Sequence, residues 1–262
     1  MKRKIVIIAA FTLAVLTVAG IYFLMYFNRQ NEEKDQDTTT AETTVPETTE
    51  DVTEPVTEAD TEPVYVSPKD FSSLRETYPH IHGWLEVPGS YIDYPIIQHP
   101  TDDTYYDRLA ADGTYSVNGC IYTEHIYNRS DFEDPVTVLY GHYVGYTDNY
   151  QFFGGLQEMY TAENYENYKK ITVYHEEKEL HYEFYAAVHY DDEHIPWNYD
   201  FSDPESYNTF LSKVQSIQNW DSVFNPDVTV TPEDKLLIFS TCYNGDPSSR
   251  FIVISKLVET IN

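Results

Sequence analysis

Residues 236–256 read LLIFSTCYNGDPSSRFIVISK, two apolar runs on either side of a short polar loop. The runs 236–239 and 251–254 are bounded by turn-forming residues, and short apolar runs of this kind predict buried strands. The loop carries the turn formers Asn-Gly-Asp-Pro, so we expect a tight, hairpin-like connection. Cys242 lies at the start of the loop, and Arg250 lies at its end. The sequence therefore predicts a thiol and a guanidinium at the same end of two adjacent strands.

This pairing suits a cysteine nucleophile, because a nearby cation favours the thiolate and can later stabilise an oxyanion. Such a nucleophile needs a proton partner, and the chain has nine His. His142 differs from the others because it follows the apolar run 136–140 and a glycine. The end of a core strand is where rigid scaffolds commonly place functional side chains. His142, Cys242 and Arg250 are the catalytic candidates, and a buried, inert Cys242 is the alternative.

The beginning of the chain predicts a membrane anchor. Residues 5–27 hold no charged side chain and are long enough to cross a bilayer. Residues 1–4 contain three bases, and a basic cluster of this kind stays cytoplasmic, which places the rest of the chain outside. A cleaved signal peptide is the alternative, although its apolar core usually has about 7–15 residues. We favour a single-pass anchor in the cell membrane.

Composition divides the rest of the chain into a linker and a domain. Residues 28–66 are rich in Thr, Pro and acids with almost no large apolar side chains, so they predict a disordered, extended tether. Residues 67–262 are long enough for one extracellular domain with a real core. This domain has 32 Asp and Glu against 11 Lys and Arg. That charge excludes nucleic acid as a natural partner, because binding phosphates requires the opposite field.

The domain is predicted to be mainly β. Eight short runs rich in Val, Ile, Tyr and Phe are separated by turn residues, which is typical of a sandwich or a closed barrel. Two helices are expected, one starting at Ser67-Pro68 and ending near Pro79, and one opening with the capping box Ser202–Glu205. The eight runs are Trp84–Val87, Tyr94–Ile97, Gly119–Tyr122, Val136–Tyr140, Ile171–Tyr174, His181–His189, Leu236–Phe239 and Phe251–Val258.

An ordered set of motifs in this domain resembles the sortases, the cysteine transpeptidases of Gram-positive cell surfaces. The run Phe239-Ser240-Thr241-Cys242 with Arg250 on the next strand matches their signature, and Tyr140-Gly141-His142 matches their histidine motif. The segments HGWLEVPGSYIDYPIIQ (82–98) and GCIY (119–122) are similar to earlier sortase segments. The resemblance covers about residues 70–258, which is essentially the whole domain.

The spacing is similar to that of class B sortases. His142 and Cys242 are 100 residues apart, and a predicted helix precedes the Cys-bearing strand. The resemblance implies a closed eight-stranded β-barrel with an N-terminal helix and a helix inserted before that strand. The two residues after the Cys, Tyr243 and Asn244, need not match those of better-known class B sortases, so the resemblance does not define the substrate contacts there. Composition alone leaves a Cys120–Cys242 disulfide open, whereas the resemblance implies a free Cys242 and a small core residue at Cys120.

The resemblance also implies a reaction. Cys242 attacks a threonine carbonyl in the C-terminal sorting signal of a surface protein, and an amine of a peptidoglycan precursor resolves the thioester. His142 acts as acid and base, and Arg250 holds the oxyanion or the substrate backbone. Ser240 and Thr241 either contact the peptide or are simple strand residues. We expect no cofactor and no metal site. The alternatives are a pilin-polymerising sortase that uses a protein lysine as acceptor, and a catalytically silent membrane-anchored binding domain.

Overall fold

The computed structural model describes residues 65–145 and 150–262. The predicted basic tail 1–4, the anchor 5–27 and the linker as far as residue 64 lie outside the described residues. Within the described ranges, no helix combines the length and the apolar character needed to cross a bilayer.

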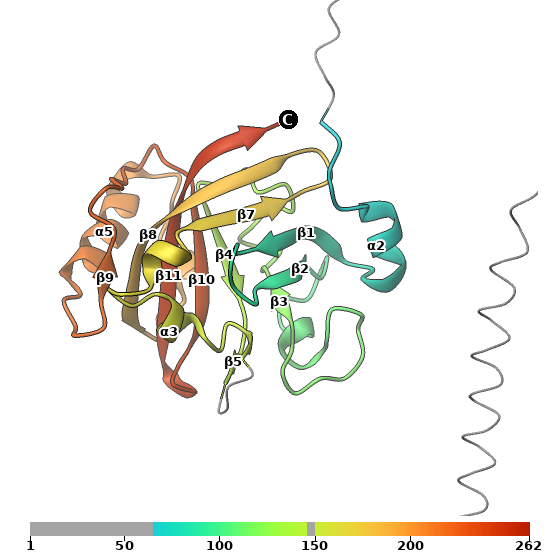
Figure 1. Ribbon diagram of the computed structural model, residues 1–262, viewed down its shortest axis with the longest axis horizontal. Coiled ribbons are helices and arrows are strands. Elements are labelled where there is room, and N and C mark those ends of the chain that lie inside the picture. Colours follow the sequence, from blue (N-terminus) through green and yellow to red (C-terminus); the bar gives the residue numbers. More distant parts are fainter. Residues whose placement is uncertain (1–64, 146–149) are drawn as a thin grey trace, which may run out of the picture. The chain divides into compact units, whose positions relative to one another are not determined.

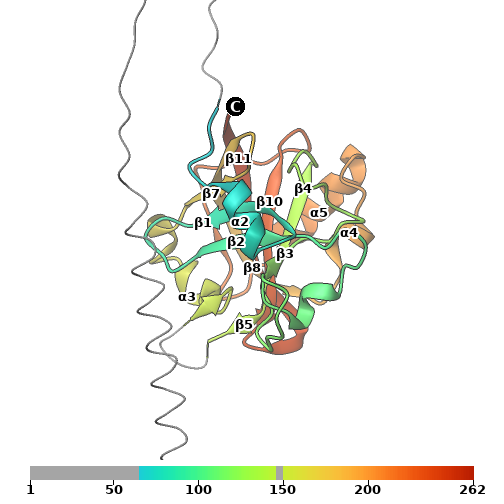
Figure 2. The ribbon, with the colours of Figure 1, turned by 90° about the vertical axis from the view of Figure 1, so that its right-hand side faces the viewer.

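The domain is built around a closed β-barrel of eight strands (Figures 1 and 2). Going around the barrel, the order is β11-β10-β4-β3-β2-β1-β7-β8, and β8 pairs with β11 to close the ring. Each of the eight predicted runs overlaps one of these strands, so the predicted barrel is confirmed, although the run Trp84–Val87 ends one residue beyond β1 and the run Gly119–Tyr122 begins two residues before β3. The strands are β1 (Ile81–Glu86), β2 (Asp93–Ile97), β3 (Ile121–Tyr122), β4 (Val136–Tyr140), β7 (Lys170–Tyr174), β8 (Glu179–Asp191), β10 (Leu236–Tyr243) and β11 (Asp246–Ile261).

The strands β10 and β11 are buried on both faces. Successive side chains of a strand point to opposite faces, and here each face meets its own core cluster. Leu237 and Phe239 belong to the cluster inside the barrel. Ile238 and Ile252 belong to a second cluster outside it. Burial on both faces explains why these segments are continuous apolar runs rather than alternating ones.

The second cluster is covered by α5 (Pro204–Ser216), which lies on the opposite side of the barrel from α2 (Phe71–Thr77) (Figure 1). The predicted positions of both helices are confirmed, but their caps differ from the prediction. Asp203 rather than Ser202 caps α5, because its carboxylate accepts hydrogen bonds from the backbone N–H groups of the first turn. Asp70 caps α2 in the same way, so that helix begins at Phe71, after the predicted Ser67-Pro68 start.

Short elements complete the domain. None of them is part of the eight-stranded ring. They are the strands β5 (Tyr143–Val144), β6 (Gln151–Phe152) and β9 (Val223–Phe224), the helices α3 (Leu156–Met159) and α4 (Ile195–Asn198), and the 3-10 turns η1 (Tyr105–Arg108) and η2 (Tyr165–Asn167). The strand β9 pairs with β8, and β5 pairs with β6.

Candidate active site

The turn between β10 and β11 sets Cys242 opposite Arg250. Tyr243 pairs with Asp246, and only Asn244 and Gly245 lie between them, both with positive φ (48° and 78°). This is the geometry of a two-residue hairpin turn, for which Asn-Gly is the preferred sequence. The predicted tight connection is confirmed, but it is shorter than expected. Since two residues reverse the chain, β11 begins at Asp246.

His142 reaches the same place from β4. The strands β4 and β10 run parallel, with Tyr140 beside Ser240, and the Gly141 N–H donates a hydrogen bond to the Ser240 carbonyl at 3.2 Å. The chain therefore leaves β4 next to the end of β10 that carries Cys242. One pocket results, and we call it the thiol cleft. It is lined by Tyr122, Tyr140, Gly141, His142, Ser240, Thr241, Cys242 and Arg250, which include all five predicted site residues.

Backbone groups fix the His142 ring. Its Nε2 donates a hydrogen bond to the Asp107 carbonyl oxygen at 2.7 Å. Because a carbonyl only accepts, Nε2 carries the proton and Nδ1 is the nitrogen that can take one up. On the other side, a Cβ built at Gly119 would lie 2.8 Å from His142 Cδ2. Sequence reasoning missed Asp107, because its contact with the ring uses only the main chain, which every residue type shares.

Two tyrosines form a neutral wall of the thiol cleft. The rings of Tyr122 and Tyr140 lie 5.6 Å apart, and the Tyr122 hydroxyl donates a hydrogen bond to Asp107 Oδ1 at 2.6 Å. Burial raises the pKa of both phenols far above the ordinary value, and nearby carboxylates raise it further. Both side chains therefore stay protonated at neutral pH. They bring hydrogen-bonding capacity to the cleft without bringing charge.

Cys242 is more exposed than the two residues that precede it on β10. Cys242 is a free, half-buried thiol. Arg250 is held on its own strand, where Nη1 donates to the Pro247 carbonyl at 2.7 Å and to the Ser249 carbonyl at 3.1 Å. Ser240 and Thr241 are 6% and 2% exposed, so they offer little surface to a peptide.

The other cysteine lies in the core. Cys120 is 2% exposed and packs in a cluster with Phe71 and Ile97. Burial raises the pKa of its thiol to about 12, because a thiolate would lose its hydration there. Both cysteines are free. The disulfide alternative is therefore wrong, and the interpretation of Cys120 as a small core residue is confirmed.

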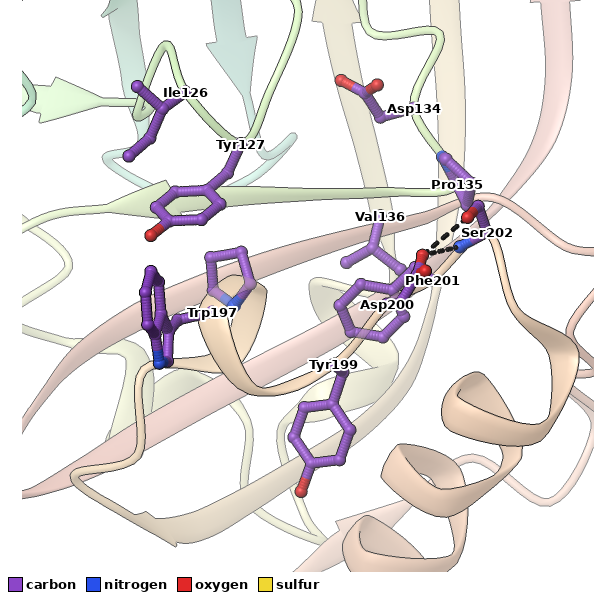
Figure 3. Close-up of a pocket in the computed structure, with 11 residues that line it drawn as sticks. Ile126, Tyr127, Asp134, Pro135, Val136, Trp197, Tyr199, Asp200, Phe201 and Ser202 are labelled. Carbon is purple, nitrogen blue, oxygen red and sulfur yellow. Dashed lines mark hydrogen bonds between the residues drawn. The ribbon is translucent and has the colours of Figure 1, made fainter.

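A separate pocket lies between the segment before β4 and the region of α4 (Figure 3). None of the predicted site residues lines it. The two acids at its edge have partners, since Asp200 accepts hydrogen bonds from the backbone and hydroxyl of Ser202, and Asp134 pairs with Arg129. Across residues 65–145 and 150–262, no cluster of three or more His, Cys, Asp or Glu side chains is arranged to hold a metal ion.

Comparison with known proteins gives one consistent family. No family model matches the chain. Sortase B of Staphylococcus aureus (strain NCTC 8325 / PS 47) is 27% identical over 191 residues, which are 72% of this chain and 75% of that protein. Sortase B of Listeria monocytogenes serovar 1/2a (strain ATCC BAA-679 / EGD-e) is 27% identical over 186 residues, covering 67% and 69%. The crystal structure of sortase B from Bacillus anthracis in complex with AAEK2 is similar with a TM-score of 0.61 and 26% identity, covering 75% and 89%.

These similarities confirm the predicted resemblance to class B sortases and the predicted fold. They also support a sortase enzyme over a catalytically silent binding domain. The individual roles of the five cleft residues and the domain boundaries remain predictions.

Proposed function

We propose that the chain is a class B sortase, a cysteine transpeptidase, with Cys242 as its nucleophile, His142 as its proton carrier and Arg250 as its fixed cation. One observation carries the proposal. His142 lies 100 residues before Cys242, yet both line a single pocket with Arg250, which is directly paired with Cys242 across two strands. The nucleophile is half-buried, whereas the second thiol of the chain is inaccessible.

In the first half of the reaction, the Cys242 sulfur attacks the carbonyl carbon of a threonine in the sorting signal. The thiol proton passes to Nδ1 of His142 as the carbon–sulfur bond forms, and His142 gives that proton to the departing amine as the peptide C–N bond breaks. Arg250 can stabilise the developing oxyanion. Both hydrogen bonds of Arg250 to the hairpin carbonyls are made by Nη1. The N–H groups on Nε and Nη2 remain for the substrate.

In the second half, an amine of a peptidoglycan precursor attacks the thioester and loses its proton to His142, and the Cys242 thiolate leaves. The hydrogen bond from Nε2 to Asp107 holds the ring so that Nδ1 exchanges the proton in both halves. The reaction needs no second base, because Nδ1 of His142 donates a proton in the first half and accepts one in the second.

The location of the reaction is part of the proposal. Residues 5–27 would anchor the chain in the cell membrane, with residues 1–4 in the cytoplasm and the catalytic domain outside. The acidic segment 28–66 would then separate the domain from the bilayer. The first partner is a surface protein with a C-terminal sorting signal, and the second is the peptidoglycan amine.

Mass spectrometry of peptide products tests the reaction. The full chain is incubated with a small library of threonine-containing pentapeptides, with and without a diamine. We expect cleavage after threonine and a product joined to the diamine. Cys242→Ala should lower kcat/KM by at least about 10³-fold, while the matched variant Cys120→Ala should retain activity. Equal loss in both variants, or full activity of Cys242→Ala, would contradict the assignment.

A further inference from the structure

The two tyrosines in the wall of the thiol cleft are both held by carboxylates that lie outside the cleft. The Tyr122 hydroxyl donates a hydrogen bond to Asp107, and the Tyr140 hydroxyl donates one to Glu124. Glu124 lies two residues after β3, and it does not itself line the cleft. Any effect of Glu124 on the chemistry of the cleft must therefore pass through Tyr140.

A histidine orients this carboxylate. Nε2 of His194 lies 3.0 and 2.9 Å from the two oxygens of Glu124, and 3.4 Å from the Tyr140 hydroxyl. Because a carboxylate accepts hydrogen bonds, Nε2 carries a proton and donates it to Glu124. The rings of His194 and Tyr140 are nearly parallel, with an angle of 7° between them. On another side, the ring of Tyr127, which is drawn in Figure 3, packs edge to face against His194 at 5.1 Å.

The Glu124 carboxylate stands where a charge is costly. Its side chain is only 17% exposed, and burial raises the pKa of its carboxyl, although His194 and the Tyr140 hydroxyl act in the opposite direction. A buried ion pair often adds no net stability, because both groups lose their hydration. Stability alone therefore does not account for the pair. Its contact with the wall of the thiol cleft points to a role in the reaction.

The hydrogen bond from Tyr140 to Glu124 limits the positions of the Tyr140 ring. A tyrosine whose hydroxyl is tied keeps one orientation, whereas a free side chain can sample several staggered rotamers. The thiol cleft has a volume of only about 130 Å³, so a ring that turned into it would occupy space that the substrate needs. A peptide would then have to order the ring when it binds. Ordering one side chain on binding weakens affinity by about three- to tenfold.

We propose that Glu124, oriented by His194, is a positioning residue that holds the Tyr140 ring in the wall and keeps the thiol cleft open to the sorting signal. This inference rests on the proposed function, because it requires the peptide to enter the cleft that contains Cys242. Once a peptide is bound, the ring is ordered again. The contribution of Glu124 therefore falls on KM, and kcat depends little on it.

Steady-state cleavage of a threonine-containing pentapeptide by the full chain tests the proposal. Glu124→Leu removes the acceptor oxygens and should raise KM by about three- to tenfold, with kcat within about twofold of the parent value. Glu124→Gln keeps a carbonyl oxygen that accepts from Tyr140, so it should restore most of the affinity. Glu179→Leu is the matched control and should leave KM unchanged. Glu179 also accepts a hydrogen bond from a histidine, His181, and its side chain is 20% exposed, but it lies at the opposite end of β8 from the position paired with Arg250.

A double-mutant cycle shows whether Glu124 acts through Tyr140. Tyr140→Phe removes the tied hydroxyl and should raise KM as Glu124→Leu does, and the double variant should show no further rise. Additive losses in the double variant would overturn the proposal, and so would an unchanged KM in folded Glu124→Leu or Tyr140→Phe protein. An equal rise in Glu179→Leu would do the same. Circular dichroism checks folding, and if Glu124→Leu does not fold, Tyr140→Phe decides alone. Cleavage by Cys242→Ala would instead show that the proposed function is wrong, and this inference would fall with it.

Discussion

The chain holds two cysteines in opposite environments. Cys120 lies in an apolar cluster with 2% of its surface exposed, and its pKa is raised to about 12. Cys242 lies in the thiol cleft, half-buried and paired across the strands with Arg250. The side chain is the same in both places, so the difference in reactivity comes from access, hydration and neighbouring charge.

The largest expected effect is on alkylation. At pH 8 a thiol with a pKa of about 12 is deprotonated in only about one molecule in ten thousand, and the Cys120 thiol is also inaccessible. We expect iodoacetamide to modify the native full chain at Cys242 alone, and to reach Cys120 only after unfolding in urea. Peptide mapping by mass spectrometry measures both sites.

Rapid modification of both cysteines in the native protein would contradict this prediction, since it would show that Cys120 is accessible in the folded protein. The Cys242→Ala variant is the control, and it should take up no label before unfolding. Label on that variant under native conditions would lead to the same conclusion.

An intermediate effect is expected from a change that disturbs the His142 ring but leaves both thiols in place. A Cβ at Gly119 would lie 2.8 Å from His142 Cδ2, and the φ of +61° disfavours any other residue. We expect Gly119→Ala to lower kcat/KM by about 10–100-fold, because a small displacement of a catalytic group is costly. Alkylation of Cys242 should continue. Peptide cleavage assays and labelling report the two results.

Gly113→Ala is the matched control for this prediction. Its φ is +80°, so the backbone strain is similar, but nothing lies within 4 Å of the added Cβ. This variant should keep its activity while losing a comparable amount of stability. If Gly119→Ala and Gly113→Ala were equally active, the contact with His142 would have no role in catalysis.

The same contrast shows what the sequence could predict. Strand runs and candidate residues were predictable, because buried strands are continuous apolar runs and the chemistry of Cys242 and Arg250 is visible in their side chains. The support of His142 was not predictable, since Asp107 contributes a carbonyl and Gly119 contributes the absence of a side chain. The caps of α2 and α5 were misplaced because several neighbouring Ser and Asp residues could each cap a helix.

The smallest expected effect concerns the stability contributed by Cys120. At pH 7, Cys120→Ala should lower the free energy of unfolding by about 1 kcal/mol, because it leaves a small cavity in the core. The thiol of the unfolded chain ionises near pH 9, whereas that of the folded chain ionises near 12. Below pH 9 both states are protonated and the side chain contributes fully to stability.

Above pH 9 the unfolded state loses the proton and the folded state does not, so the contribution of Cys120 falls by up to about 1.4 kcal/mol per pH unit. The destabilisation caused by Cys120→Ala should therefore shrink above pH 9 and change sign as the pH approaches 10. Urea unfolding at pH 7 and pH 10, with both proteins in the Cys242→Ala background, isolates this one thiol. Tyrosines with raised pKa values weaken both proteins equally and cancel in the difference. A destabilisation that stayed constant across this range would mean that Cys120 ionises as readily in the folded protein as in the unfolded chain, and the burial that separates it from Cys242 would then be too weak to keep it inert.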